Sequence, residues 1–350
     1  EARAAPGIVF RVEPGASGAL AAVFGGRADM APVEAKDADH VRSRIEAGSP
    51  VRLVRVAGAD LVLVLLNLAD PHAPEAGWLD RDGDLVRDED EPWRRQRPHP
   101  ILGDVEVRQA LASAIDYRRL IDRVAYGEAA RLPADVPPAA AWAFASGLAP
   151  TRTDPTAARL RLEAAGWLDR DGDGTLERDR VPLRLDLLVS QGNTAHEIAA
   201  EELTLAMARA GVQVRQRRVD YGELIGDVLG QRFDMALVTW HDLPPGADPG
   251  DRWSRRGDRP GLGPNCASLA DAELERLLAE TRGVPGCDAD TMARGYQAVQ
   301  ARVQALAPIL PLYSPHALYV LGPRLAGWQP GPWSVYQVPA ISAVGRATAD

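Results

Sequence analysis

Two acidic loops of identical sequence carry the side chains most clearly spaced for chemistry. The octapeptide GWLDRDGD occurs at residues 77–84 and again at residues 166–173. In the second copy, carboxylates occupy the first, third and fifth positions of a calcium-binding loop, and a glycine follows at the sixth. These carboxylates are Asp169, Asp171 and Asp173. Oxygen ligands at this spacing can converge on one hard cation.

Both loops also depart from the calcium-binding pattern. The second copy has Arg180 at the twelfth position, where such loops place a bidentate glutamate. The first copy has Leu85 in place of the turn glycine, although Glu91 occupies its twelfth position. We therefore favour acidic surface turns and keep a calcium site at the second copy as the alternative.

Signatures of catalysis do not occur in the sequence. His196 and Glu197 begin a zinc-protease pattern, but Ala200 stands where the second histidine is required. The chain has no nucleophile elbow, phosphate-binding glycine loop or dinucleotide fingerprint, and its six histidines have no ligand spacing. We predict a protein without a cofactor that is not an enzyme. A hydrolase would need a nucleophile and a base that converge from distant positions.

Size and charge narrow the class of protein further. The 350 residues, 46% hydrophobic and 25% charged, are typical of a globular protein large enough for more than one lobe. A net charge of −9 argues against nucleic acid as a partner, because phosphate binding needs clustered positive charge. The longest apolar run, Leu61–Leu66, is far shorter than the roughly 20 residues of a membrane helix. Cys266 and Cys287 can pair in an oxidising compartment or stay as thiols.

A helix pair at Val107–Gly127 is the clearest structural element. Its apolar residues recur at the helical spacing i, i+3, i+4 and i+7, which predicts a buried scaffold. Asp116 is expected to cap the second helix, and Gly127 to end it in the left-handed conformation. Arg108 is expected on the surface, or in an ion pair on the side of a hinge.

Alternating strands and helices over residues 181–240 predict a βαβαβ unit with a mostly parallel sheet. Ligands of such sheets lie at the carboxyl ends of the strands, here Ser190–Asn193 and Trp240–Asp242. Asn193 is expected to be a helix cap, and so is Asp154, which precedes a helix predicted to run from Pro155 to Ala165. Near the amino end, Ile8–Val12 and Leu61–Asn67 are predicted strands, the second apolar on both faces.

Stretches in a fixed order along the chain resemble one known family. They are FRVEPGASGALAAVFGGRADMA, LVLLNL, VRQALASAIDYRRLIDRV, VPPAAAWAF, GWLDRDGDG at 166–174, the unit from Leu183 to Trp240, NCASLADAELERLL and PLYSPHALYVLGPRLAGW. Together they resemble the C-terminal two-thirds of the extracytoplasmic solute-binding proteins of the peptide/nickel type, which deliver ligands to ABC importers. The resemblance covers about 340 residues, and the order of the stretches makes it specific.

The resemblance implies an α/β, periplasmic-binding-protein-like bilobal fold with mixed or parallel sheets flanked by helices, and one lobe incomplete at the N-terminus. We expect residues 1–69 to form part of the first lobe with a hinge strand. Residues 70–104 are a Pro/Asp/Arg-rich excursion, 105–311 the second lobe, and 312–350 the return to the first lobe. The implied protein is an extracytoplasmic monomer, periplasmic or lipid-anchored, whose partners are a peptide or other small solute and an ABC permease.

Polar and aromatic side chains near the expected cleft are the ligand candidates that this resemblance implies. They are Asn67, Trp142, Trp240, His241, Asp242, Asn265 and Tyr313. Relatives that bind peptides place an aspartate three residues after the tryptophan to pair the peptide amine. Leu243 occupies that position here, and Asp242 could serve only with a shifted loop. A ligand-sensing domain of a transcriptional regulator is the alternative function, since such domains occur behind a helix-turn-helix segment.

Overall fold

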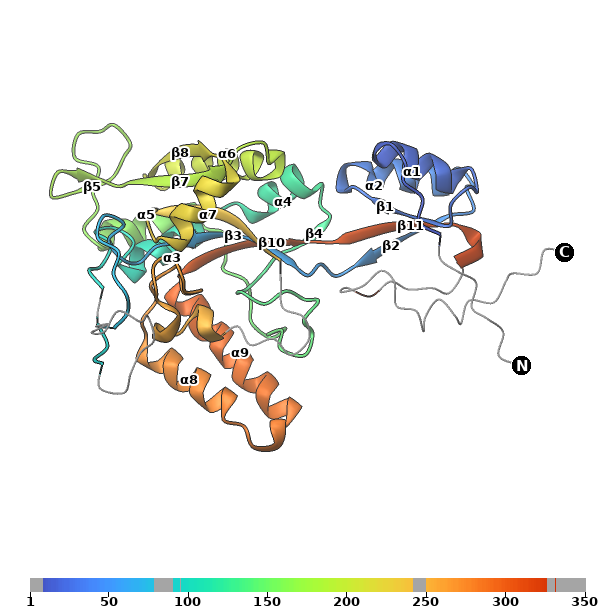
Figure 1. The fold of residues 1–350 in the computed structure, drawn as a ribbon. Coiled ribbons are helices and arrows are strands. Elements are labelled where there is room, and N and C mark those ends of the chain that lie inside the picture. Colours follow the sequence, from blue (N-terminus) through green and yellow to red (C-terminus); the bar gives the residue numbers. More distant parts are fainter. Residues whose placement is uncertain (1–8, 79–90, 95, 242–249, 326–330, 332–350) are drawn as a thin grey trace.

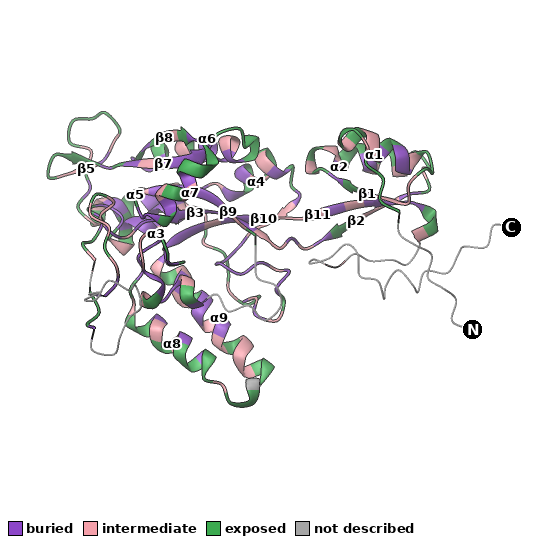
Figure 2. Ribbon diagram, viewed as in Figure 1, coloured by how far each residue is buried: buried purple, intermediate pink, exposed green. Residues whose placement is uncertain are grey.

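Two lobes of unequal size, joined by extended strands, make up the molecule (Figure 1). The computed structural model describes residues 9–78, 91–94, 96–241, 250–325 and 331, without the side chain of Cys287. Buried residues line the inner faces of helices and strands in both lobes (Figure 2). The mixed α/β architecture agrees with the predicted fold class.

The small lobe is a three-stranded antiparallel sheet covered by two helices. Its strands, in the order β1-β11-β2, are β1 (Met30–Val33), β11 (Ala317–Leu321) and β2 (Arg52–Val56). Helices α1 (Gly15–Phe24) and α2 (Ala38–Glu46) pack on one face through an apolar cluster that includes Val23, Val41 and Val320. The predicted strand at 8–12 was wrong for its described residues 9–12, which pair with no described strand and leave Val9 and Val12 exposed.

The large lobe contains a six-stranded mixed sheet. Its order is β4 (Ala129–Ala130), β10 (Ile309–Pro315), β3 (Asp60–Leu66), β9 (Met235–His241), β7 (Arg184–Ser190) and β8 (Gln213–Val219). Strands β9, β7 and β8 run parallel, as the βαβαβ pattern predicts, whereas β3 runs antiparallel to both β9 and β10. Two of the five pairings in this sheet are therefore parallel and three are antiparallel.

Helices cover both faces of this sheet, which explains why β3 is apolar on both sides. One face carries α3 (Val105–Ala114), α4 (Tyr117–Ala125), α5 (Pro155–Ala164) and α6 (Thr194–Arg209), and the other α7 (Tyr221–Leu229), α8 (Ala272–Arg282) and α9 (Ala289–Leu306). Successive residues of β3 enter the two cores alternately: Val62, Val64 and Leu66 on the first face, and Leu61, Leu63 and Leu65 on the second. Each such burial contributes about 1.5–3 kcal/mol.

Three predicted helix caps are confirmed. The side chains of Asp116, Asp154 and Asn193 accept hydrogen bonds from backbone N–H groups at 3.1, 2.9 and 3.1 Å. Helix α4 takes up the left-handed conformation one residue earlier than expected, at Tyr126 (φ 51°), and Gly127 follows with φ 76°.

The prediction for Arg108 was wrong, because its side chain is buried. Its Nε and Nη2 donate to the carbonyl oxygen of Leu306 at 2.9 and 2.7 Å, and Nη1 donates to the carbonyl of Leu102 at 2.7 Å. Leu306 is the last residue of α9, where carbonyl groups lack partners within the helix. A guanidinium satisfies such carbonyls and favours the negative end of the helix dipole.

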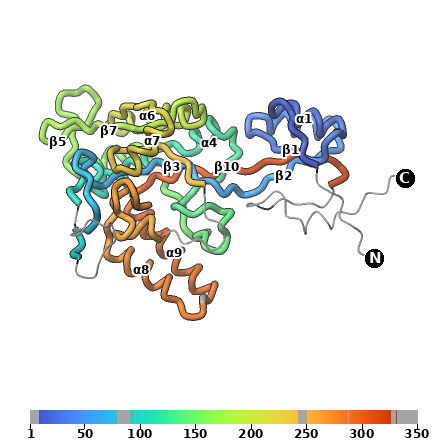
Figure 3. The backbone as a smooth tube through the Cα atoms, viewed as in Figure 1, coloured from blue at the N-terminus to red at the C-terminus, as the bar shows by residue number. Residues whose placement is uncertain are grey.

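The chain passes between the lobes at two described places, which lie side by side (Figure 3). Residues 57–59 join β2 to β3, and His316 joins β10 to β11. The Ser314 hydroxyl donates to the carbonyl of Gly58 at 3.1 Å. The approach is so close that a Cβ atom on Gly58 would lie 1.7 Å from the Pro315 oxygen. We call these two passages the crossing.

Candidate functional site

The carboxyl end of β9 lies at the crossing. In the antiparallel register of β3 and β9, Trp240 is opposite Leu61 and His241 is opposite Asp60. His241 Nδ1 and the Asp60 carboxylate are 3.1 Å apart, and Asp60 follows Gly58 by two residues. Trp240 and His241 therefore stand where the large lobe meets the small one. The predicted residue Asp242 lies outside the described part of the chain.

Aromatic and cationic groups gather around Trp240. The Trp253 ring lies 6.0 Å from the Trp240 ring, centre to centre, and the Arg252 guanidinium carbon is 3.9 Å from the Trp240 ring centre. Trp253 is fully buried and its Nε1 donates to a carboxylate oxygen of Asp135 at 2.5 Å. The half-buried Trp240 ring is thus held in place and accepts a cation on its face. Sequence reasoning missed Trp253 and Asp135, and the only signal was a tryptophan within a Pro/Gly/Arg-rich loop.

The parallel neighbour β7 ends at the same edge of the sheet. His196, in the first turn of α6, has its Nε2 2.9 Å from the hydroxyl of Thr239 on β9. Burial lowers the pKa of His196, so the ring is neutral at pH 7. Asn193 is engaged as the cap of α6. The side chains of Asn193 and His196 are thus fixed by hydrogen bonds, and neither carries a charge at pH 7.

Two predicted ligand residues, Asn67 and Asn265, lie at the other end of β9. Asn67 follows Leu66, and Leu66 is opposite Met235, the first residue of β9. Met235 lies five residues before Trp240 in β9, which places that end of the strand about 17 Å from Trp240. The antiparallel direction of β3, which the sequence analysis did not predict, is the reason that Asn67 and Trp240 are not brought together.

Both asparagine side chains are fully buried and hydrogen-bonded. The Asn67 amide donates to the carbonyl of Gln231 at 2.8 Å and accepts from the backbone N–H of Ala69 at 3.1 Å. The Asn265 amide donates to the carbonyls of Ser254 and Leu269, both at 2.9 Å. These contacts fasten loops to the base of β9, and we do not include either residue in the candidate site.

A buried carboxylate, Asp258, completes this network at the base of β9. Its Oδ1 accepts from the amides of Gln96 and Gln231, both at 2.8 Å, and from the Ser268 hydroxyl at 3.2 Å. No ion pair of Asp258 occurs within the described residues. Burial raises the Asp258 pKa to about 6, although the three hydrogen bonds favour the ionised form.

The two remaining aromatic candidates, Tyr313 and Trp142, lie in two different hydrophobic clusters. Tyr313 is buried in the core of the large lobe opposite Val62, and burial raises its pKa. Trp142 packs edge-to-face on Tyr296 of α9 at 5.3 Å, within a small separate cluster. A hollow of about 400 Å³ between α3, α5 and the end of α9 holds none of the predicted residues.

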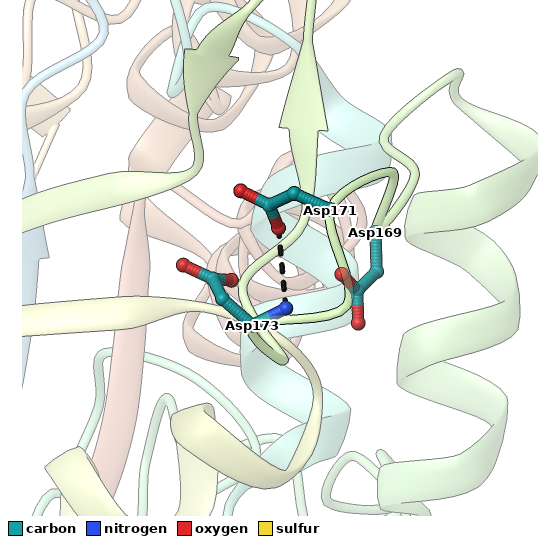
Figure 4. Close-up of side chains that lie close together, drawn as sticks. All are labelled: Asp169, Asp171 and Asp173. Atoms are coloured by element: carbon teal, nitrogen blue, oxygen red, sulfur yellow. Dashed lines mark hydrogen bonds between the residues drawn. The ribbon is translucent and has the colours of Figure 1, made fainter.

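The second acidic loop forms a compact turn (Figure 4). Carboxylate oxygens of Asp169, Asp171 and Asp173 lie within 4.8 Å of one another, and two of the three side chains are exposed. Each accepts a backbone N–H from its own turn, at 2.7–3.1 Å. Arg159 lies 3.6 Å from Asp169. The calcium alternative remains a prediction, and the corresponding loop of the first copy lies outside the described residues.

Comparison with known proteins identifies the family. The model of the bacterial extracellular solute-binding proteins, family 5, matches residues 2–257. The chain belongs to this family. Its fold agrees with that of NikA from Brucella suis, solved with Fe(III)-EDTA, at a TM-score of 0.67 and 19% identity over 95% of this chain and 60% of that one.

Two curated relatives are binding proteins rather than enzymes. The oligopeptide-binding protein AppA of Bacillus subtilis is 24% identical over 65% of this chain and 42% of its own length. The nickel-binding periplasmic protein of Escherichia coli is 31% identical over 41% of this chain and 30% of its own. The chain therefore spans less than half the length of these family 5 relatives. In the described residues, no helix has the length and apolar character needed to traverse a lipid bilayer.

Proposed function

We propose that this family 5 chain captures a peptide or other small solute between its two lobes, and that the whole protein delivers this solute to an ABC permease. The observation that carries the proposal is the position of Trp240 at the crossing, beside Trp253 and Arg252. An aromatic face next to a hinge can be covered by the second lobe when the lobes close.

The proposal includes capture without catalysis, by a monomer outside the cytoplasm, whether periplasmic or lipid-anchored. The names of the relatives support this class over a DNA-binding regulator or a hydrolase. The small and large lobes are the two jaws, and Trp240, His241 and Asp242 are the proposed ligand residues. His241 and Asp60 supply polar groups, while the Trp240 ring supplies an apolar wall.

Replacing Trp240 is expected to weaken ligand binding at least about tenfold, because an aromatic wall contributes on the order of 1.5 kcal/mol or more. Trialanine, a mixture of longer peptides and nickel–histidine are the probes, screened by thermal shift on the complete gene product. A probe at 100 times its Kd should stabilise the protein by about 2.7 kcal/mol. Titration calorimetry then compares Trp240→Ala with the parent.

Trp142→Ala is the matched control, since it removes the same ring from the cluster with Tyr296. It should lower stability and leave affinity unchanged. A larger loss of affinity in Trp142→Ala than in Trp240→Ala would move the site to the proline-rich loop. No response to any probe would argue against a solute receptor of this specificity.

A further inference from the structure

A single carboxylate of the large lobe is held by two arginines of the small lobe. Glu128 follows α4, and its side chain is only 3% exposed. Its Oε1 accepts hydrogen bonds from Arg42 of α2 and, at 3.1 Å, from Arg55 of β2. The second oxygen lies 2.9 Å from Arg55 Nε. Both ion pairs therefore span the two lobes.

The backbone of Glu128 is fixed to the large lobe at the crossing. Its carbonyl accepts from the backbone N–H of His316 at 2.9 Å. The next two residues, Ala129 and Ala130, pair with Pro315 and Ser314 of β10. A rotation of the small lobe about the crossing would carry the two arginines past a carboxylate that cannot follow them.

Separating Glu128 from Arg42 and Arg55 would be energetically unfavourable, because the Glu128 carboxylate is buried and charged. Burial alone would raise the Glu128 pKa, but Arg42 and Arg55 more than offset it, and the pKa lies below its ordinary value. Burial and the neighbouring Arg55 lower the pKa of His316, whose ring lies 3.8 Å from the carboxylate. Asp39, which also pairs with Arg42, is exposed. A buried ionised carboxylate that loses its partners is strongly unfavourable.

We infer that Glu128 is a positioning residue that fixes the angle between the two lobes through Arg42 and Arg55. The inference concerns lobe geometry, and it rests on the proposed function only for its consequence that Glu128 sets how readily the lobes close on a ligand. The experiment below uses no ligand. The experiment can therefore contradict the inference about Glu128 while the proposed function stands. Equally, the proposed function can be contradicted while this inference stands.

The test measures the distance between the lobes in solution by double electron–electron resonance. Spin labels are attached at Glu46→Cys on α2 and Ala208→Cys on α6, both exposed, in a chain whose Cys266 and Cys287 are replaced by serine. The parent should give one narrow distance distribution. Glu128→Gln, which keeps the shape and removes the charge, should broaden that distribution at least twofold.

Glu202→Gln is the matched control. Glu202 is 7% exposed and also pairs with two arginines, Arg119 and Arg123, but both belong to α4 of the same lobe. Its loss should lower the melting temperature and leave the interlobe distance unchanged. Arg55→Gln is a second test variant. It is expected to fold normally, because the Arg55 side chain is half exposed.

Agreement between Glu128→Gln and Arg55→Gln, with no further broadening in the double variant, would support the inference. Unchanged distances in both variants, with a loss of melting temperature like that of Glu202→Gln, would overturn it and leave Glu128 a purely structural residue.

Discussion

Gly58→Ala is expected to lower the free energy of unfolding by about 3 kcal/mol or more. The added methyl group would lie 1.7 Å from the carbonyl oxygen of Pro315 and 3.0 Å from the Ser314 hydroxyl. The first of these atoms is backbone and cannot rotate away. The two passages of the crossing would have to separate, and the hydrogen bond between Ser314 and Gly58 would be lost with them.

Urea denaturation followed by tryptophan fluorescence measures this change, with Gly226→Ala as the matched control. Gly226 lies within α7, has no atom within 4 Å of an added Cβ, and has no positive φ. Alanine there should raise stability by up to about 1 kcal/mol through helix propensity. A Gly58→Ala protein as stable as the parent would show that the two passages are not in close contact.

Asp258→Asn is expected to stabilise the protein by about 3 kcal/mol at pH 8, since the pKa of this buried carboxyl is raised from 3.8 to about 6. A raised pKa means that the folded state binds the proton more tightly than the unfolded state does. Stability from this group is therefore present below pH 4 and is lost as pH rises to 6. Asparagine removes the buried charge and keeps an acceptor for Gln96, Gln231 and Ser268.

The measurement compares urea denaturation of the variant and the parent at pH 8 and pH 4.5, and the advantage of the variant should shrink at the lower pH. Asp271→Asn is a control of opposite sign. Arg302 lowers the pKa of Asp271 below its ordinary value of 3.8, so that variant should be less stable than the parent at pH 8 and, by nearly the same amount, at pH 4.5. An Asp258→Asn protein less stable than the parent at pH 8 would contradict the assignment of a destabilising buried charge.

Local patterns in the sequence predicted most elements of this fold. The apolar stripe at 107–127, the caps Asp116 and Asp154, and the strands and helices of the βαβαβ unit depend on neighbours a few residues away. The strand predicted at Ile8–Val12 was wrong over its described residues 9–12, because a strand needs a partner and hydrophobic β-branched residues do not supply one. Arg108 was misplaced because its acceptor, Leu306, is 198 residues distant.

The site was harder to predict because it depends on strand direction. Two apolar strands give no local sign of whether they run parallel or antiparallel, and that choice decides whether Asn67 or Asp60 lies beside Trp240. Glu128 escaped prediction for a similar reason, since its arginines are 86 and 73 residues away. Trp240 and His241 were proposed because the strand pattern and the resemblance both indicated the strand end on which they lie, and their role in binding stays a prediction.

The central claim, capture of a solute between the lobes, is tested most directly by the interlobe distance with and without a ligand. The labels at positions 46 and 208 report that distance in the complete gene product, with trialanine, longer peptides and nickel–histidine added in turn. A probe that stabilises the protein should shorten the distance and narrow its distribution, and Trp240→Ala should weaken that response. A probe that binds tightly while the distance stays unchanged would contradict capture between the lobes.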